Sequence, residues 1–243
     1  MLLVIDIGNS RVKWALADTA DLLSEMGACL HAEIAASRLA IVAKKATKVF
    51  VANVADEEIL NKINQLVSPL PVETLQVTNH ACGVENLYDQ PKTLGADRWA
   101  ATVAAWHITQ KPTIIVNAGT AVTIDSLNII GAFLGGTIQP GLRLMQETLK
   151  KNTAQLLNAD GNLQFFPKNT ADAVFSGCMN AIVSAILMQL ERQTAHYGKP
   201  PAVILTGGDA HKIAEALKLD AKQVIIIENL VLQGLVLLEK ESR

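Results

Sequence analysis

The chain has 243 residues, of which 50% are hydrophobic, 18% charged and 4% aromatic, and 21 basic against 23 acidic side chains give a net charge of −2. This composition excludes a disordered or fibrous protein and predicts a globular one with an aliphatic core, in one large or two small domains. No predicted helix carries a basic stripe, so we do not expect nucleic acid as a partner.

The cysteines and the apolar runs indicate a cytoplasmic protein. The three cysteines are too widely spaced for a disulfide framework or a zinc knuckle. The first apolar run ends at Asp6, without the charged start and long apolar middle of a signal peptide. The apolar stretch 230–240 is shorter than the roughly 20 residues of a membrane span. We therefore expect no membrane partner.

The first half of the chain predicts a β-hairpin followed by alternating helices and strands. The hairpin is indicated by the β-rich runs 2–7 and 12–17 on either side of a short turn. Hydrophobic periodicity then predicts helices over 36–47, 56–68 and 96–110, and strands over 48–54 and 72–77. Residues 85–95 are expected to form a loop.

The same pattern begins again at residue 113. Strands are predicted within 113–127 and 129–141, helices over 142–157 and 170–197, a strand and helix over 202–217, and a strand and closing helix over 223–240.

The two halves also align with each other. When the sequence is displaced by 111 residues along itself, the first glycine turn falls on the second and Asp6 falls on Asn117. We therefore expect two domains with like folds, residues 1–112 and 113–243.

Three glycine turns follow apolar strands, in the sequences DIGNS, NAGTA and LTGGDA. Backbone N–H groups in such turns are not crowded by a Cβ and can hold a phosphate, and the third turn opens a helix whose N-terminus also favours an anion. A single turn of this kind is more often a simple chain reversal. Two hairpin turns facing each other across a cleft, with the third behind them, would clamp a nucleotide.

Asp6 and Lys13 flank the first of these turns. A carboxylate that interrupts an apolar strand is costly without a partner, so Asp6 either holds Mg²⁺ through water or accepts hydrogen bonds from the Gly8 and Asn9 amides in an Asx turn. Lys13 either reaches a phosphate or points into solvent. The residues alone leave both alternatives open.

Asp97 and Arg98 begin the helix predicted over 96–110. The helix dipole is a sufficient reason for an acid in the first turn, and the residues alone favour this structural role for Asp97. If the turn faced a cleft, Asp97 could take a proton from a substrate hydroxyl during phosphoryl transfer, and Arg98 could bind a substrate carboxylate. The P-loop and dinucleotide-binding motifs are absent from the sequence.

Several stretches together resemble the type III pantothenate kinases. DIGNSRVKW and NAGTAVTID are similar to the two phosphate motifs of this family, LYDQPKTLGADRWAA to its substrate segment, GGTIQPGLRLMQETLKKNTAQL to the stretch after the second phosphate turn, and LTGGDA to its adenosine turn. The family belongs to the superfamily of acetate and sugar kinases, heat-shock chaperones and actin. The resemblance therefore implies an α/β fold of two ribonuclease-H-like, actin-like ATPase domains with mixed β-sheets flanked by helices, and a nucleotide cleft between the domains.

The resemblance also implies an activity, a homodimer and roles for residues. The γ-phosphate of ATP would pass to the primary hydroxyl of pantothenate, the first step towards coenzyme A, with Asp97 as general base. ATP phosphates and Mg²⁺ would be bound by Asp6, Ile7, Gly8, Asn9, Ser10, Arg11, Val12, Lys13 and Thr120. Pantothenate would contact Tyr88, Gly95, Ala96, Asp97, Arg98 and Thr170, and adenosine would contact Gly207 and Gly208.

Asn117 departs from the pattern of many family members, which carry at this position an acid that binds a monovalent cation. A neutral amide can coordinate K⁺ or NH₄⁺ but supplies no charge, so a requirement for this cation is left open. Two alternatives also stay open: a kinase for another small hydroxyl compound, and a non-catalytic transcription accessory factor. The second predicts decayed nucleotide turns, whereas Asp6, Lys13 and Asp97 are intact.

Overall fold

The structure, a computed structural model, describes residues 1–152 and 161–242. By contacts the chain forms two compact units, the first made of Met1–Gln110, Gly131–Leu134 and Asn229–Arg243, and the second of Lys111–Ile130 and Gly135–Glu228. The domains 1–112 and 113–243 remain a prediction.

A five-stranded mixed sheet forms the centre of the first unit, in the order β3-β2-β1-β4-β5. Its strands are β1 (Leu2–Ile7), β2 (Arg11–Ala17), β3 (Leu23–Leu30), β4 (Lys48–Asn53) and β5 (Val72–Thr74). β1 pairs antiparallel with β2, as the apolar runs predict, and parallel with β4. The sequence analysis assigned no element to β3, since its side chains alternate between half-buried and exposed and give a weak apolar signal.

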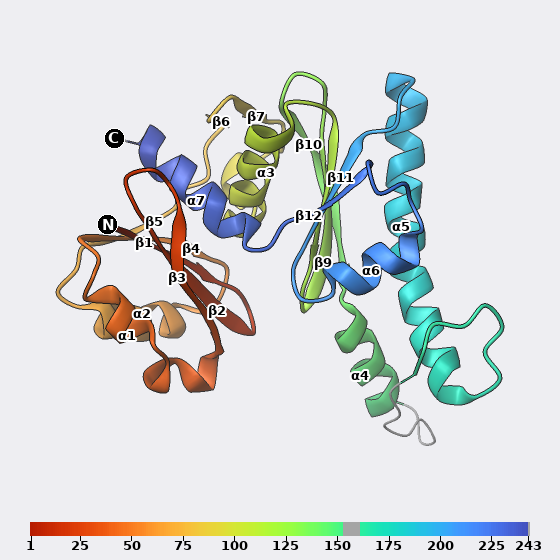
Figure 1. Ribbon diagram of the computed structural model, residues 1–243, viewed down its shortest axis with the longest axis horizontal. Helices are drawn as coiled ribbons and strands as arrows, with labels where there is room; N and C mark the ends of the chain where they lie inside the picture. Colours follow the sequence, from red (N-terminus) through yellow and green to blue (C-terminus); the bar gives the residue numbers. More distant parts are fainter. Residues whose placement is uncertain (153–160, 243) are drawn as a thin grey trace. The chain divides into compact units, whose positions relative to one another are not determined.

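Helices cover both faces of this sheet (Figure 1). The short helices η1 (His31–Ala36) and α1 (Leu39–Ala43) lie with α2 (Glu57–Val67) on one face. α3 (Ala96–Thr109) and α7 (Leu230–Glu241) pack against each other and against the strands on the other face. The loop expected over 85–95 contains the end of β7 (Val84–Asn86) and the turn η2 (Pro91–Thr93), and β7 pairs with β6 (His80–Ala81).

The second unit is built on strands β8 (Thr113–Ala118), β9 (Ala121–Leu127), β11 (Ala202–Thr206) and β12 (Val224–Ile226). The second sheet has the order β12-β11-β8-β9-β10-β7-β6. Its strand β10 (Ala132–Pro140) begins in the first unit, where it pairs with β7, and continues in the second. The helices of this unit are α4 (Leu142–Asn152), α5 (Thr170–Tyr197) and α6 (Ala210–Leu217).

The helix predicted over 170–197 is confirmed by α5, which ends at Gly198 in the left-handed conformation. Its N-cap is Asn169, whose side chain accepts the Asp172 N–H at 2.9 Å, so Thr170 is the first helical residue and not the cap. The predicted helix 142–157 is confirmed as far as Asn152, and its last residues lie outside the described part of the chain.

Candidate active site

The first glycine turn joins β1 to β2 in the first unit. The Gly8 N–H donates to the Arg11 carbonyl at 3.0 Å, and the strand register pairs Asp6 with Lys13. The Gly8 carbonyl in turn accepts a hydrogen bond from Nε2 of His31, 2.8 Å away at the start of η1. The turn is therefore fixed from both sides, and Asn9 at its tip is exposed.

Asp6 is a buried carboxyl group, 8% exposed, at the end of β1. Burial raises its pKa to about 7; Lys13 opposes this shift, and the charge of Asp97 adds to it. The Gly8 N–H donates to Arg11 and not to Asp6, so the expected Asx turn does not form at Gly8. In the described residues no group of three or more His, Cys, Asp or Glu side chains could hold a metal ion alone.

Asp97 lies in the first turn of α3, where its Oδ1 accepts the backbone N–H of Arg98 at 2.8 Å. Burial raises the pKa of Asp97, and the Arg98 amide and guanidinium partly offset the shift. Gly95 at the N-cap leaves room for this carboxylate, because a Cβ on Gly95 would lie 2.7 Å from Oδ1. The charge of Asp97 contributes to the raised pKa of Asp6, and both acids belong to the first unit.

Arg98 lies beside Asp97 and is 5% exposed. Its guanidinium donates to the Tyr88 hydroxyl at 3.2 Å and lies 5.7 Å from the Tyr88 ring centroid and 5.8 Å from that of Phe133. Cation–π contacts of this kind fix the plane of the guanidinium. Phe133, from the start of β10, is a member of the site that the sequence analysis missed, because its position in an apolar strand is typical of a core residue.

The second glycine turn joins β8 to β9 in the second unit and is one residue shorter than the first. Ala118 pairs with Val122, and the Gly119 N–H donates to the Ala121 carbonyl at 3.0 Å. The partner of Asn117 is therefore Thr123. A displacement of 111 residues aligns β1 with β8, the strands before the two turns. The strands after the turns, β2 and β9, align with a displacement that is one residue shorter.

The third glycine turn and the start of α4 pack against this second turn. Gly207 has φ +95°, and a Cβ there would lie 2.4 Å from the Ala118 carbonyl oxygen. The Gly141 N–H donates to the Thr120 carbonyl at 2.8 Å, and a Cβ added to Gly141 would lie 2.2 Å from the Gly119 carbonyl oxygen. Only glycine fits at either position without displacing the backbone. Gly141 was not predicted as a site residue, although a glycine directly before a helix is a usable signal.

The structure thus brings the predicted residues together in two sets, one in each unit. The first unit holds Asp6, Ile7, Gly8, Asn9, Ser10, Arg11, Val12, Lys13, Tyr88, Gly95, Ala96, Asp97 and Arg98. The second unit holds Asn117, Thr120, Thr170, Gly207 and Gly208. In this second unit, Asn117 pairs across β8 and β11 with Thr206, the residue before Gly207, so the second and third turns leave the same end of the sheet.

Comparison of the sequence with known families gives one consistent result. The family description "Type III pantothenate kinase" matches residues 2–192. A type III pantothenate kinase from Laribacter hongkongensis is 40% identical over 242 residues, covering 100% of both chains. One from Aromatoleum aromaticum is 41% identical over 247 residues, covering 100% of this chain and 99% of the relative.

Solved structures resemble the fold at low sequence identity. A Campylobacter jejuni protein described as a Baf family transcriptional activator has a TM-score of 0.64 at 23% identity, covering 99% of this chain and 98% of that one. A ParM protein from psk41 has a TM-score of 0.52 at 8% identity, covering 100% of this chain and 99% of that one. A glucokinase from an Antarctic psychrotroph has a TM-score of 0.51 at 13% identity, covering 98% of both chains. These likenesses concern the fold alone, and they confirm the expected α/β fold with two mixed sheets flanked by helices.

Proposed function

Because this chain belongs to the type III pantothenate kinase family, which phosphorylates pantothenate with ATP in the first step of coenzyme A synthesis, we propose that Asp97 is its general base. The observation that carries the proposal is the environment of Asp97: a carboxylate at the start of α3, held by the Arg98 amide, with its pKa raised by burial. A raised pKa makes the carboxylate a better proton acceptor. Asp97 would accept the proton of the primary hydroxyl as that oxygen attacks the γ-phosphorus of ATP, while the bond from this phosphorus to the β–γ bridging oxygen breaks and ADP leaves.

The ATP phosphates are bound by the glycine turns. The first turn contributes backbone N–H groups of Asn9 and Ser10, and Lys13, the strand partner of Asp6, contributes a positive charge. The turn at Thr120 and the helix start at Gly207 and Gly208 contribute further donors.

Mg²⁺ fits the chemistry of Asp6, whose carboxylate would hold the ion through water, since Mg²⁺ keeps several of its water ligands in proteins. Because one or two carboxylates would not hold the ion alone, its remaining ligands would be water and phosphate oxygens. When bound, Mg²⁺ neutralises charge on the phosphates. Without the ion, burial raises the pKa of the Asp6 carboxyl to about 7, and a bound cation would favour its charged form.

Pantothenate is a carboxylic acid, and Arg98 is the cation that would bind its carboxylate. The contacts with Tyr88 and Phe133 support this role, since they hold the guanidinium plane for a bidentate contact. Gly95, Ala96 and Thr170 are proposed as further contacts of this substrate.

We assign Asn117 as a weak ligand for K⁺ or NH₄⁺. The Asn117 amide supplies an oxygen ligand without charge, so affinity for the cation is expected to be low. Activity measured against K⁺ concentration tests this assignment: Asn117→Asp is expected to reach half-maximal activity at a lower K⁺ concentration than the wild type. Equal K⁺ curves for the two proteins would remove Asn117 from the cation site.

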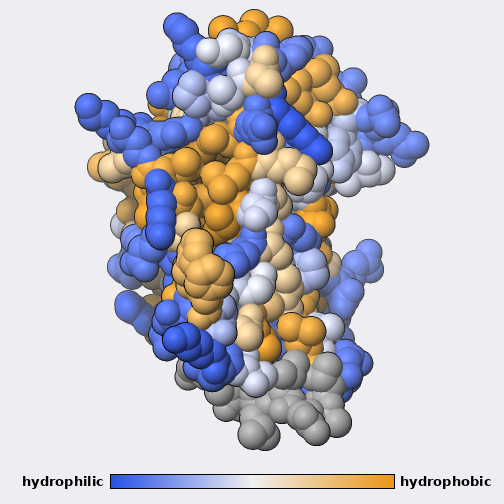
Figure 2. Space-filling view, turned by 90° about the vertical axis from the view of Figure 1, so that its right-hand side faces the viewer, coloured by the Kyte–Doolittle hydropathy of each residue, from blue (hydrophilic) through white to orange (hydrophobic). Residues whose placement is uncertain are grey.

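A homodimer, formed through α5, is also proposed. Between Asp172 and Glu191 this helix carries no charged residue, and Leu187 and Met188 are exposed on it. Figure 2 shows hydrophobic surface on this side of the molecule. By length and hydropathy α5 could also span a membrane, a property that it shares with the core helices of soluble proteins. We propose a cytoplasmic dimer; sedimentation equilibrium of the wild type and of Met188→Glu tests it, with a monomeric wild type as the contradicting result.

Asp97→Asn tests the proposed general base. The amide keeps the size of the side chain but cannot accept the proton, so kcat is expected to fall by about 10²–10⁴-fold while the affinity for ATP is kept. The matched control is Asp56→Asn, an exposed acid at the N-cap of α2, for which kcat is expected to stay unchanged. An unchanged kcat in Asp97→Asn would exclude Asp97 as the base.

A further inference from the structure

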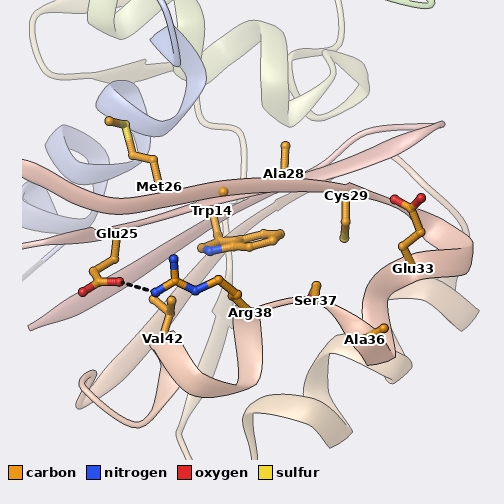
Figure 3. Close-up of a pocket in the computed structure, with 11 residues that line it drawn as sticks. Trp14, Glu25, Met26, Ala28, Cys29, Glu33, Ala36, Ser37, Arg38 and Val42 are labelled. Atoms are coloured by element: carbon orange, nitrogen blue, oxygen red, sulfur yellow. Dashed lines mark hydrogen bonds and ion pairs between the residues drawn. The ribbon is translucent and has the colours of Figure 1, made fainter.

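A cavity of about 470 Å³ lies in the first unit among β2, β3, η1 and α1. Figure 3 shows the Trp14 indole within it, with Cys29 and Val42 among the apolar walls and Glu25, Glu33 and Arg38 among the polar groups. The wall is opened by a bulge in β3, where Glu25 and Met26 lie opposite Ala15 and Glu25 has φ 48°. This size is within the range of small-molecule sites.

The acceptor groups around the cavity already have partners. Lys45 lies 2.5 Å from Oε1 of Glu25 and lowers the pKa of this carboxyl. Glu33 accepts the Leu30 N–H at 2.9 Å. The Ser37 hydroxyl donates to the Ile34 carbonyl at 2.7 Å. The carboxylates of Glu25 and Glu33, which would repel an anion in the cavity, therefore already interact with Lys45 and with the Leu30 N–H.

Two donor groups at the cavity, in contrast, can still donate hydrogen bonds to a ligand. Trp14 is 3% exposed, and its Nε1–H has no hydrogen-bond partner in the described part of the chain. The Arg38 guanidinium makes one long contact, 3.5 Å to Glu25, and its side chain is 76% exposed. Figure 3 shows the nitrogen edge of Trp14 on the same side of the cavity as this guanidinium. A buried N–H without an acceptor costs free energy that a ligand acceptor would recover.

We propose that this cavity is a binding site for a small carboxylic acid with an apolar body. The carboxylate binds Arg38 and accepts the Trp14 N–H, and the apolar body lies against Cys29 and Val42. The site is separate from Asp6 and Asp97, and neither residue lines it.

The position of η1 links this site to the first glycine turn. The same helix carries Glu33 and Ala36 on the cavity wall and His31 on the Gly8 carbonyl. A ligand that displaces η1 therefore changes the position of the Gly8 peptide. This coupling rests on the proposed role of the turn in ATP binding, whereas occupancy of the cavity does not.

The test is a titration with sodium hexanoate, followed by the indole N–H signals in ¹⁵N-edited NMR of the full chain. The three tryptophans give three signals, and Trp14→Phe identifies that of Trp14. We expect a saturable shift of the Trp14 signal with hexanoate and none with 1-hexanol, which has the same apolar body without the charge. Absence of a saturable shift, or an equal shift with 1-hexanol, overturns the proposal.

Arg38→Gln provides a second test that leaves the core intact. We expect it to weaken hexanoate binding by about tenfold or more, because the charge-assisted contact is lost. Lys44→Gln removes the same charge from an exposed residue outside the cavity and is expected to leave binding unchanged. Equal affinities of the two variants would overturn the assignment of Arg38.

A change in KM for ATP at saturating hexanoate tests the coupling. If this change is absent while the Trp14 signal still saturates, the link through η1 fails and the ligand site stands.

Discussion

Nε2 of His31 lies 2.8 Å from the carbonyl oxygen of Gly8, so a residue 23 positions later in the chain fixes a peptide of the first glycine turn. A carbonyl oxygen only accepts, so Nε2 carries the proton. In a trans peptide the C=O and the following N–H point in opposite directions, and the contact therefore turns the Asn9 N–H away from His31. His31 is a positioning residue for the proposed phosphate site.

Replacement of His31 by alanine is predicted to weaken ATP binding. Loss of one hydrogen bond that orients a phosphate donor is expected to raise KM for ATP by about tenfold, with a smaller change in kcat. Steady-state kinetics at varied ATP concentration measures both constants. His80→Ala, which removes an exposed histidine, serves as the control. If KM is the same in both variants, the contact does not position the turn.

Gly95→Ala is predicted to lower kcat without unfolding the protein. The backbone at Gly95 has φ −58°, which alanine adopts without strain, but its Cβ would lie 2.7 Å from Oδ1 of Asp97 and displace that carboxylate. We expect kcat to fall by about tenfold or more. In the Asp97→Asn background the same substitution should cause little further loss, because the group that it displaces is already inactive. Additive losses would show that Gly95 acts elsewhere.

The buried Asp6 carboxyl predicts a pH dependence of stability. Its folded-state pKa of about 7 exceeds the ordinary value of 3.8, so the folded protein binds a proton that the unfolded chain releases. The contribution of Asp6 to the free energy of unfolding is then largest below about pH 4 and falls by a few kcal/mol as the pH rises through 7. Asp6→Asn is expected to lose less stability between about pH 5 and about pH 8 in urea denaturation than the wild type. Parallel losses in the two proteins would contradict the shift.

Gly207→Ala and its neighbour Gly208→Ala form a matched pair for the third turn. A Cβ at Gly207 would lie 2.4 Å from a backbone oxygen and would require φ +95°, whereas one at Gly208 meets nothing within 4 Å. We expect Gly207→Ala to lower the free energy of unfolding by about 2–4 kcal/mol and Gly208→Ala by less than about 1 kcal/mol. Chemical denaturation measures both, and equal effects would contradict the proposed packing of the turns.

The sequence alone determined the elements whose signals are local. The hairpin of β1 and β2, with its two β-rich runs around a short turn, and the glycine stop after α5 were predictable because each depends on nearby residues. The family was also identifiable from five ordered motifs. Aligning the two halves of the sequence could not predict that the second turn is one residue shorter than the first. Strand register is set by the length of the turn, which the alignment does not give.

The tertiary structure decided which residues share a site. Asp6 and Asp97 are 91 positions apart in the numbering, and only the folded first unit lets the charge of one raise the pKa of the other. The residues that were missed, among them His31 and Phe133, act through contacts made across strands and helices. Local periodicity carries no information about such contacts, since they depend on how elements distant in the sequence pack together.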